Sequence, residues 1–596
     1  MSSQAAAPAL GTAAHEPIQR RRRMTELVLL LLALVLAVGA NFLVDPDRFA
    51  EDSAHVLRTA IVLGGGCLLV HVILWFRAPY ADPYILPIVV TLNGLGLAMI
   101  HRIDLLMDSN AAGSQLLWTG VGVAGAAAVL LLLKDHRALR KVTYISLVVS
   151  ALLLILPLLP GLGTEINGAR IWISIGGRTF QPGEIAKITL AIFFAGYLST
   201  NRDVILLAGP KIGPLHLPRF RDLAPLFAAW LVSIGVLVLQ RDLGTAILFF
   251  GLFVAMLYLA TGRLSWIILG LLFVAAGGFV ASQTFGHVAA RLDSWIHAFD
   301  PEIYDAPVGG SRQIVQGLFG LASGGLFGQG WGQGRPDLVS YANSDMIITA
   351  FGEELGLIGV SAILILFFLL ASRGYRASLG TPDMFGKLLS AGLASIMVIQ
   401  LFVVVGGVTR VIPLTGLTTP FMSAGGSSML SNWIIMALLL AISHSARRPI
   451  VYGPASDEEI AEFEAHEQEE AERTRAEEAA RLERADRRRA RREERSGEDS
   501  EREQRAPAGV GAPRSGARPG KQSQGGPGRA RTLSPEASSE ETEVVPLSRG
   551  TRSKAAETDD EPTEIRALDP AADRLSHRSR SAQDQSPEDS SRGGRP

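Results

Sequence analysis

Asp345 is the residue whose type and position most directly suggest chemistry. It lies in the stretch 341–348, where a long polar loop enters an apolar segment of membrane-spanning length. A carboxylate at the edge of a membrane is partly desolvated, and ionisable groups at such depths usually serve transport, proton handling or catalysis. Aspartate is also a common helix N-cap, because its side chain accepts hydrogen bonds from free backbone N–H groups. Position alone leaves both roles open.

Two arginines and a tryptophan make the outer loop 161–183 a candidate ligand-binding segment. The guanidinium groups of Arg170 and Arg178 could hold phosphate oxygens through paired hydrogen bonds. Trp172 lies among apolar residues, which is typical of an anchor at the membrane interface, and a contact with a ligand is the alternative.

Glu184 and Lys187 open the next apolar segment, three residues apart on one helical face. A lysine inside a membrane span needs a partner, so either the two side chains pair or Lys187 meets a phosphorylated ligand. Farther along, Asp242 lies in a tight turn. We expect it to have a structural role, by capping the following helix, by pairing with Arg241, or both.

The longest outer loop, 286–345, carries dense glycines between 317 and 334, followed by Asp337. Glycine at this density lets the backbone approach a ligand closely and allows movement. No strand–turn–helix context surrounds these glycines, so they do not form a dinucleotide-binding fingerprint.

Glu353 and Glu354 follow in an apolar sequence. Asp345 and Glu353 would lie about 12 Å apart along one helix, which is too far for a paired-carboxylate site. The glutamates are therefore expected to hold neighbouring helices, or Arg410, in place.

The last outer loop, 407–426, contains Arg410 and ends beside Ser427. Its prolines and glycines break helical structure between two spans. Irregular backbone at membrane depth is tolerated only against protein or a water-filled cavity. We therefore expect this loop to line a polar groove.

The elements that position these residues are membrane spans, so the fold class is an all-α polytopic membrane protein. Of the 596 residues, 48% are hydrophobic and only 19% are charged. A helix of roughly 20 apolar residues crosses a bilayer. About twelve such segments occur within residues 24–445, near 24–44, 56–76, 83–101, 116–133, 142–160, 184–200, 222–239, 243–260, 265–285, 355–372, 385–406 and 427–445.

The distribution of lysine and arginine predicts the orientation. Basic residues precede the first span and recur in alternate loops, at Arg20, Arg77, Lys134, Arg219, Arg263, Arg373 and Arg447 among others. Because short cytoplasmic loops carry the excess of basic residues, both termini are expected in the cytoplasm and the protein in the plasma membrane. No cleavable signal peptide is expected. The single cysteine, Cys67, excludes a disulfide within the chain.

Two polar segments flank the membrane domain, a short one at 1–23 and a long tail at 446–596. The tail is rich in Glu, Arg and Ala up to about residue 505, where charges four residues apart could support an exposed helix. Beyond that, its composition predicts disorder in the cytoplasm. Its charges alternate in sign, so no nucleic-acid partner is expected.

Ordered motifs resemble those of the SEDS family, the RodA/FtsW/SpoVE group of polytopic membrane proteins. The resemblance covers roughly residues 115–445 and is closest to RodA-type elongation proteins. Arg241 and Ala424 depart from the proline and the aromatic residue usual at those positions. The motifs are NGARIWI at 167–173, QPGEIAK at 181–187, DLGT at 242–245, SDMII at 344–348 with GEELG at 352–356, IPLTG at 412–416 and SAGGSS at 423–428.

The resemblance implies a ten-helix core with two additional N-terminal spans, and a peptidoglycan glycosyltransferase that polymerises lipid II beside a class B penicillin-binding transpeptidase. In that chemistry a carboxylate accepts the proton of the attacking sugar hydroxyl, and Asp345 is the candidate base. Arg170, Lys187 and Arg410 are candidates for stabilising the leaving pyrophosphate, with a divalent cation such as Mg or Mn as a possible helper. Further candidate substrate contacts are Trp172, Asp337 and Ser427, and no residues are assigned as metal ligands.

Two other functions fit the same features. A lipid flippase would use a similar groove and cations, but near the midplane of the membrane rather than at its outer side. A non-catalytic scaffold would recruit the transpeptidase without needing Asp345. The division-type FtsW polymerase is the alternative within the family.

Overall fold

A computed structural model describes most of the chain up to Arg448. The described residues are 12–44, 49–166, 168–207, 211–212, 215–216, 227–228, 230–231, 235, 238–306 and 309–448. The predicted tail lies outside them from residue 449 onward, as do the first eleven residues of the predicted N-terminal segment.

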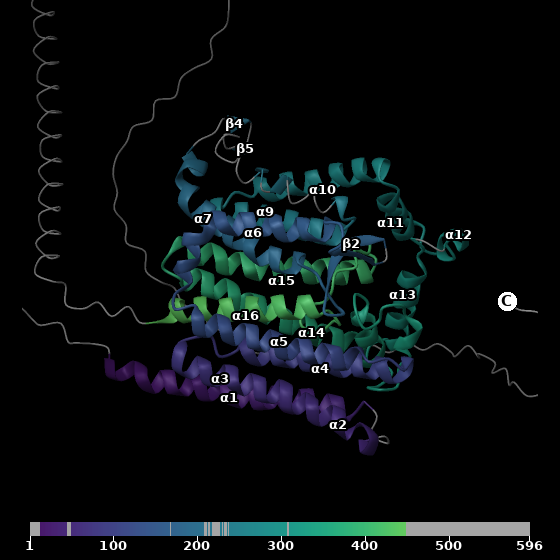
Figure 1. Ribbon diagram of the computed structural model, residues 1–596, viewed down its shortest axis with the longest axis horizontal. Coiled ribbons are helices and arrows are strands. Elements are labelled where there is room, and N and C mark those ends of the chain that lie inside the picture. The colour runs from purple at the N-terminus through teal and green to yellow at the C-terminus, as the bar shows by residue number, and fades with distance from the viewer. Residues whose placement is uncertain are drawn as a thin grey trace, which may run out of the picture. The chain divides into compact units, whose positions relative to one another are not determined.

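Long helices dominate the described residues and lie side by side with nearly parallel axes (Figure 1). The long helices are α1 (Thr12–Phe42), α3 (Gly65–Arg77), α4 (Ile85–Met107), α5 (Ala111–Leu132), α6 (Thr143–Ile155), α7 (Gly183–Leu207), α9 (Leu243–Thr261), α10 (Ser265–Thr284), α14 (Ile347–Gly380), α15 (Met384–Val408) and α16 (Gly426–Arg447). Helix α3 continues α2 (Phe49–Thr59) through a π-helical turn at Ala60–Gly64, and α6 is flanked by 3₁₀ turns at His136–Val142 and Leu156–Leu158.

Ten of these segments are long and apolar enough to cross a membrane, by length and composition. They coincide with ten of the twelve predicted spans. The span predicted at 184–200 is helical, as α7, but is not among the ten. The span predicted at 222–239 falls largely outside the described residues.

The helices differ in how much of their apolar surface the protein itself covers. In the most apolar 18-residue stretch of α4, 83% is buried inside the protein, whereas in that of α10 only 11% is. Helices α15 and α16 are also mostly buried, at 78% each. A helix that is apolar on all sides is either in a core or in lipid. Helices α4, α15 and α16 therefore form the centre, and α10 lies at the periphery.

The predicted outer loops contain regular structure of their own. Loop 161–183 folds into a three-stranded antiparallel sheet in the order β1–β2–β3, a small departure from an all-α chain. Its strands are β1 (Gly163–Ile166), β2 (Ala169–Ile175) and β3 (Arg178–Phe180), with Ile173 opposite both Gly163 and Phe180; a second, two-stranded sheet joins β4 (Lys211–Ile212) and β5 (Leu215–His216).

Loop 286–345 is largely helical rather than irregular. It contains α11 (Gly286–Ile296), α12 (Pro301–Tyr304), α13 (Arg312–Gly324) and a 3₁₀ turn at Pro336–Leu338. Helices α11, α12 and α13 lie together at one end of the bundle (Figure 1). Loop 286–345 is predicted from the basic residues to face outward, so this end of the bundle is called the outer end.

Helix α14 is interrupted at Gly356, whose backbone has φ +67° and ψ −170°. The glycine-rich loop supplies the hydrogen bonds that this break removes. The N–H groups of Gln329 and Gly330 donate to the carbonyls of Glu353 (2.9 Å) and Glu354 (3.0 Å), and those of Leu357 and Ile358 donate to Gly325 (3.0 Å) and Leu326 (3.1 Å). Within a membrane each backbone group needs such a partner. The glycines thus let the backbone of the loop approach α14 closely, whereas from the sequence we expected them to let it approach a ligand.

Replacing Gly356 by alanine should destabilise the protein. This backbone conformation is essentially restricted to glycine and costs other residues on the order of 1–3 kcal/mol. A Cβ would also lie 2.3 Å from the nitrogen of Gly328 and 2.6 Å from the oxygen of Leu326. Thermal unfolding of the purified protein in detergent should show a melting temperature lowered by several degrees.

The matched control is Gly277→Ala in α10, where an added Cβ meets nothing within 4 Å. It should leave the melting temperature unchanged or slightly raised, because alanine favours helix. Equal melting temperatures for Gly356→Ala and wild type would show that the break is not needed.

Candidate active site

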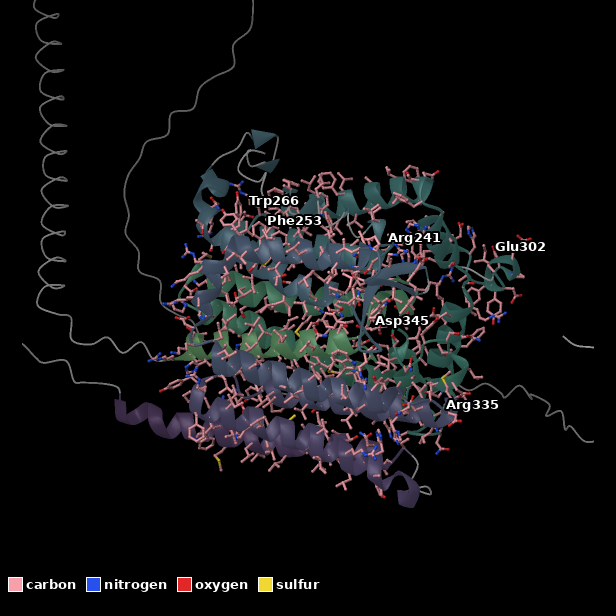
Figure 2. The ribbon with its side chains drawn as sticks, viewed as in Figure 1. Arg241, Phe253, Trp266, Glu302, Arg335 and Asp345 are labelled. Carbon is pink, nitrogen blue, oxygen red and sulfur yellow. The ribbon has the colours of Figure 1, made fainter. Side chains whose placement is uncertain are left out.

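Asp345 lies at the outer end of the bundle, immediately before α14 (Figure 2). Its carboxylate is half-buried and does not act as the cap of α14, since the N-cap position is Met346. The side-chain amide of Gln313, on α13, donates to both carboxylate oxygens at 3.4 Å. From the other side, Oδ2 lies 4.0 Å from the position that a Cβ on Gly416 would occupy.

The loop between α15 and α16, residues 409–425, holds the chain just before Asp345. The N–H of Ala424 donates to the carbonyl of Asn343 at 2.8 Å, and the hydroxyl of Ser423 donates to the carbonyl of Ser344 at 2.6 Å. Gln115 of α5 secures the same loop, because its amide bonds to the carbonyl of Ser423 (2.9 Å) and the N–H of Gly425 (3.0 Å). Asp345 is thus positioned by backbone contacts from a distant part of the sequence.

Helix α11 brings Arg291 close to this carboxylate. Its guanidinium donates to the carbonyl of Thr415 at 3.2 Å and acts electrostatically on both Asp345 and Asp242. Asp242 caps α9, accepting from the N–H of Thr245 at 3.0 Å. The capping role expected for Asp242 is therefore present, but its cationic neighbour is Arg291 rather than Arg241.

The surroundings of Asp345 change its acidity. Burial raises the pKa of Asp345 to about 6, while hydrogen bonds, including that from Gln313, and the charge of Arg291 oppose this shift. Burial likewise raises the pKa of Asp242 against the N-cap hydrogen bond to Thr245 and the charge of Arg291. A carboxylate with a pKa near 6 is ionised at neutral pH yet basic enough to take a proton from an alcohol in a transition state.

Sequence reasoning missed Arg291 and Gln313. Both lie in the outer loop 286–345, whose helices were not expected. The signal was present in α11, where Arg291 stands among apolar residues on an amphipathic segment, and in α13, where Gln313 follows Ser311 and Arg312 at the start of an apolar helix.

Lys187 and Glu184 lie beneath loop 409–425 and are buried. Lys187 donates to Glu184 at 2.5 Å and to the side chain of Gln400 at 3.1 Å, and Gln400 in turn donates to the carbonyl of Thr418 at 2.8 Å. The hydroxyl of Ser431 also donates to Glu184, at 2.7 Å. Of the two roles left open for Lys187, the geometry displays the pairing with Glu184.

Ser427 lies close by, where its hydroxyl accepts a hydrogen bond from the N–H of Gln181 at 2.8 Å. This bond joins the start of α16 to the chain that enters α7.

Arg410 is engaged with protein rather than open to a ligand. Its guanidinium donates to the carbonyls of Trp295 (2.6 Å) and Ile296 (2.8 Å) at the end of α11, and the indole of Trp295 donates back to the carbonyl of Arg410 at 3.0 Å. The ring of Phe299 lies 5.3 Å from its charge. Arg410 therefore fastens α11 to loop 409–425.

The glutamates of α14 do not contact Arg410. Glu354 accepts from Arg102 of α4 at 3.3 Å and from the N–H of Gly332 at 2.9 Å, and Glu353 accepts from the N–H of Arg335 at 2.9 Å. Of the two partners expected for this pair, the structure has the neighbouring helix; the glycine-rich loop is a further partner that was not expected.

Arg170, Trp172 and Asp337 lie on the outer side but do not contact Asp345. Arg170 is half-exposed on β2 and faces Glu165 at 3.8 Å, a solvent-exposed pair that stabilises little. Its N–H donates to the carbonyl of Gln240 at 3.3 Å, which joins the sheet to the turn that carries Asp242. Asp337 forms a two-pronged ion pair with Arg335 at 2.8 and 2.9 Å.

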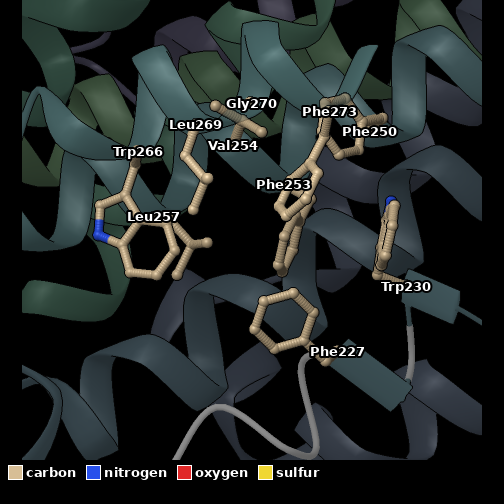
Figure 3. A pocket seen from close by; sticks show the side chains of 10 residues that line it. All are labelled: Phe227, Trp230, Phe250, Phe253, Val254, Leu257, Trp266, Leu269, Gly270 and Phe273. Atoms are coloured by element: carbon tan, nitrogen blue, oxygen red, sulfur yellow. The ribbon is translucent and has the colours of Figure 1, made fainter. Parts of the chain in front are cut away.

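An apolar pocket between α9 and α10 lies apart from these groups (Figure 3). Figure 2 shows Phe253 and Trp266, which line it, displaced along the bundle from Asp345. Phe253 is about 16 Å along α9 from Asp242. The pocket carries no acid, base or cation and is not the catalytic site; its lining is Phe227, Trp230, Phe250, Phe253, Val254, Leu257, Trp266, Leu269, Gly270 and Phe273.

The Glu184–Lys187 pair supports a stability prediction. Removing one partner of a buried ion pair leaves an uncompensated charge and costs about 3–5 kcal/mol, whereas replacing both is often nearly neutral. Glu184→Gln and Lys187→Met should each lower the melting temperature in detergent, and the double variant should recover much of the loss.

Losses that simply add in the double variant would contradict this coupling. They would show that Lys187 and Glu184 stabilise the bundle independently.

Comparison with known proteins shows which family the chain belongs to. Residues 83–448 match the family FtsW/RodA/SpoVE, described as cell cycle proteins. Peptidoglycan glycosyltransferase RodA of Mycobacterium tuberculosis (strain ATCC 25618 / H37Rv) is 47% identical over 451 residues, which cover 74% of this chain and 94% of that protein. Stage V sporulation protein E of Bacillus subtilis (strain 168) is 33% identical, covering 61% and 98%.

A solved structure shares the fold. It comes from a peptidoglycan synthase complex that is described as coordinating polymerization and crosslinking. Its TM-score is 0.50 at 24% sequence identity, and the match covers 62% of this chain and 99% of that chain. Motifs, helices and relatives agree, and the chain belongs to the FtsW/RodA/SpoVE family.

Proposed function

We propose that this protein is a peptidoglycan glycosyltransferase that polymerises lipid II, with Asp345 as the general base. The observation that carries the proposal is the setting of Asp345: a half-buried carboxylate at the outer end of the bundle, held by a hydrogen-bonded loop and with a pKa of about 6. The family membership and the name of the mycobacterial relative support the reaction class.

The proposed reaction is a single displacement. The 4-hydroxyl oxygen of the acceptor N-acetylglucosamine attacks the anomeric carbon of the donor N-acetylmuramic acid while Asp345 accepts the hydroxyl proton. The bond from the anomeric carbon to the diphosphate oxygen breaks, and polyprenyl diphosphate leaves with the electron pair. One displacement inverts the anomeric centre, so no covalent sugar–enzyme intermediate is needed.

The leaving diphosphate requires positive charge. Of the three cations that the resemblance implies, Arg170 is best placed to provide it, because its only ion pair among the described residues is exposed and weak. Lys187 and Arg410 are already hydrogen-bonded inside the protein, so we propose that they support the site from within. Trp172, beside Arg170, is a proposed contact for the lipid headgroup.

A divalent cation is proposed only as an ion that accompanies the diphosphate of the substrate. Across the part of the chain that the structure describes, no three His, Cys, Asp or Glu side chains cluster as a metal-ligand set. No step of the proposed reaction depends on a resident metal.

We further propose that the protein acts in cell elongation beside a class B penicillin-binding transpeptidase. Its setting would be the plasma membrane, with twelve spans and both termini in the cytoplasm. The ten apolar helices, together with α7 and the segment predicted at 222–239, would make up this even number.

Asp345→Asn should abolish glycan polymerisation. The amide cannot accept the hydroxyl proton, and losing a positioned base reduces the rate on the order of a hundredfold or more. The assay uses purified full-length protein with its transpeptidase, and labelled lipid II. Asp305→Asn, in an exposed pair with Arg312 on the same outer face, is the control and should polymerise normally.

Strands made at the wild-type rate by a folded Asp345→Asn protein would remove Asp345 from the mechanism. Wild-type protein that moves lipid II across vesicles without joining it would favour a flippase instead.

The pH dependence of kcat/KM should reveal the same group. A base must be ionised to act, and the pKa of Asp345 in the free protein is about 6. Activity should therefore be level near pH 8 and fall about tenfold for each pH unit below 6. An acidic limb near pH 4, the usual range of an exposed aspartate, would exclude a buried carboxylate as the base.

A further inference from the structure

Arg291 interacts electrostatically with both half-buried carboxylates of the site, and it is not needed to hold the fold there. Helix α11 is already fastened to loop 409–425 by the three hydrogen bonds between Arg410 and residues Trp295 and Ile296. Arg291 adds one bond from the same helix to the same loop, at Thr415. From this position its guanidinium interacts electrostatically with both Asp345 and Asp242.

The packing of the start of α9 keeps this arrangement tight. A Cβ on Gly244 would lie 2.8 Å from the side chain of Leu417 and 3.1 Å from the carbonyl of Thr415. The carbonyl that holds Arg291 therefore rests directly against the turn that carries Asp242.

The polar and charged groups that face the site come from four elements. On α13, Gln313 contributes a neutral hydrogen bond to Asp345, while α11 contributes Arg291. At the start of α9, Asp242 faces Arg291 and also feels the like charge of Glu184 on α7. His287 lies within electrostatic range of Arg241 and Arg291, and its pKa is lowered by burial and by these two arginines. Arg291 is the cation shared by the two acids.

We propose that Arg291 is a positioning residue, which shares its charge between Asp345 and Asp242 and thereby keeps Asp345 ionised and ready to accept the proton of the incoming sugar hydroxyl. This rests on the proposed role of Asp345 as base. Asp242 acts as the competing partner, so that Arg291 stabilises the ionised form of Asp345 only in part. A base held entirely by an arginine would be a weak proton acceptor, and one with no cation nearby would be ionised to a smaller fraction at neutral pH.

Two substitutions should move the acidic limb of the pH profile in opposite directions. Arg291→Gln removes the charge, so the acidic limb of the kcat/KM profile should move up by about one pH unit. Activity should then fall about fivefold at pH 6 and about tenfold well below it, with a loss of less than about threefold at pH 9. Asp242→Asn removes the competing acid but keeps a good N-cap for α9, so the limb should move to lower pH. Arg291→Lys retains the charge and should keep the wild-type limb.

The experiment uses the full chain with its transpeptidase and labelled lipid II, after thermal unfolding has shown that each variant is folded. An unchanged limb in both Arg291→Gln and Asp242→Asn would overturn the proposal. A raised KM in Arg291→Gln with an unmoved limb would also overturn it, because Arg291 would then contact the substrate. If Arg291→Gln does not fold, Asp242→Asn and Arg291→Lys still decide.

Failure of this proposal differs from failure of the proposed function. If Asp345→Asn is inactive while the limbs do not move, only the role of Arg291 is lost. If Asp345→Asn polymerises normally, the base itself has been misassigned.

Discussion

The contact between loop 409–425 and the chain at Asn343 and Ser344 is the constraint on which the site depends. It places Asp345 against Gly416 and Gln313. A carboxylate at the edge of a membrane has little water to stabilise it, so its protonation and position are set by the protein groups around it. The broken backbone of the loop supplies those groups, because its carbonyls and N–H groups are not consumed within a helix.

The same loop also organises the outer helices. Arg410 and Arg291 attach α11 to it at two points, and Gln400 connects it to the buried Lys187 beneath. An arginine that donates its hydrogen bonds to carbonyls needs no carboxylate partner, so the nearby carboxylates are not tied up in a direct ion pair with it. Arginine therefore serves two purposes here, as a mechanical connection through Arg410 and as a source of charge through Arg291.

Glycine has a structural purpose at a second point of the bundle. The break at Gly356 and the loop 325–330 exchange backbone hydrogen bonds, and Glu354 binds Arg102 and Gly332 beside them. Helix α14, which follows Asp345, is thereby fixed at its outer half. The glycines make this possible because a Cβ on Gly328 would lie only 2.2 Å from the carbonyl oxygen of Glu354.

The sequence by itself determined the membrane-spanning character, ten of the predicted spans and the family, because long apolar runs and motif spacing are local properties of a chain. It also singled out Asp345, whose role as the base stays a prediction. It could not reveal that loop 286–345 folds into helices α11 and α13, nor that Arg291 and Gln313 face Asp345. It also could not decide between ligand and protein partners for Lys187 and Arg410. Those outcomes depend on contacts between residues tens to hundreds of positions apart, such as Arg291 with Thr415 and Lys187 with Gln400, and only the packing of the helices brings such pairs together.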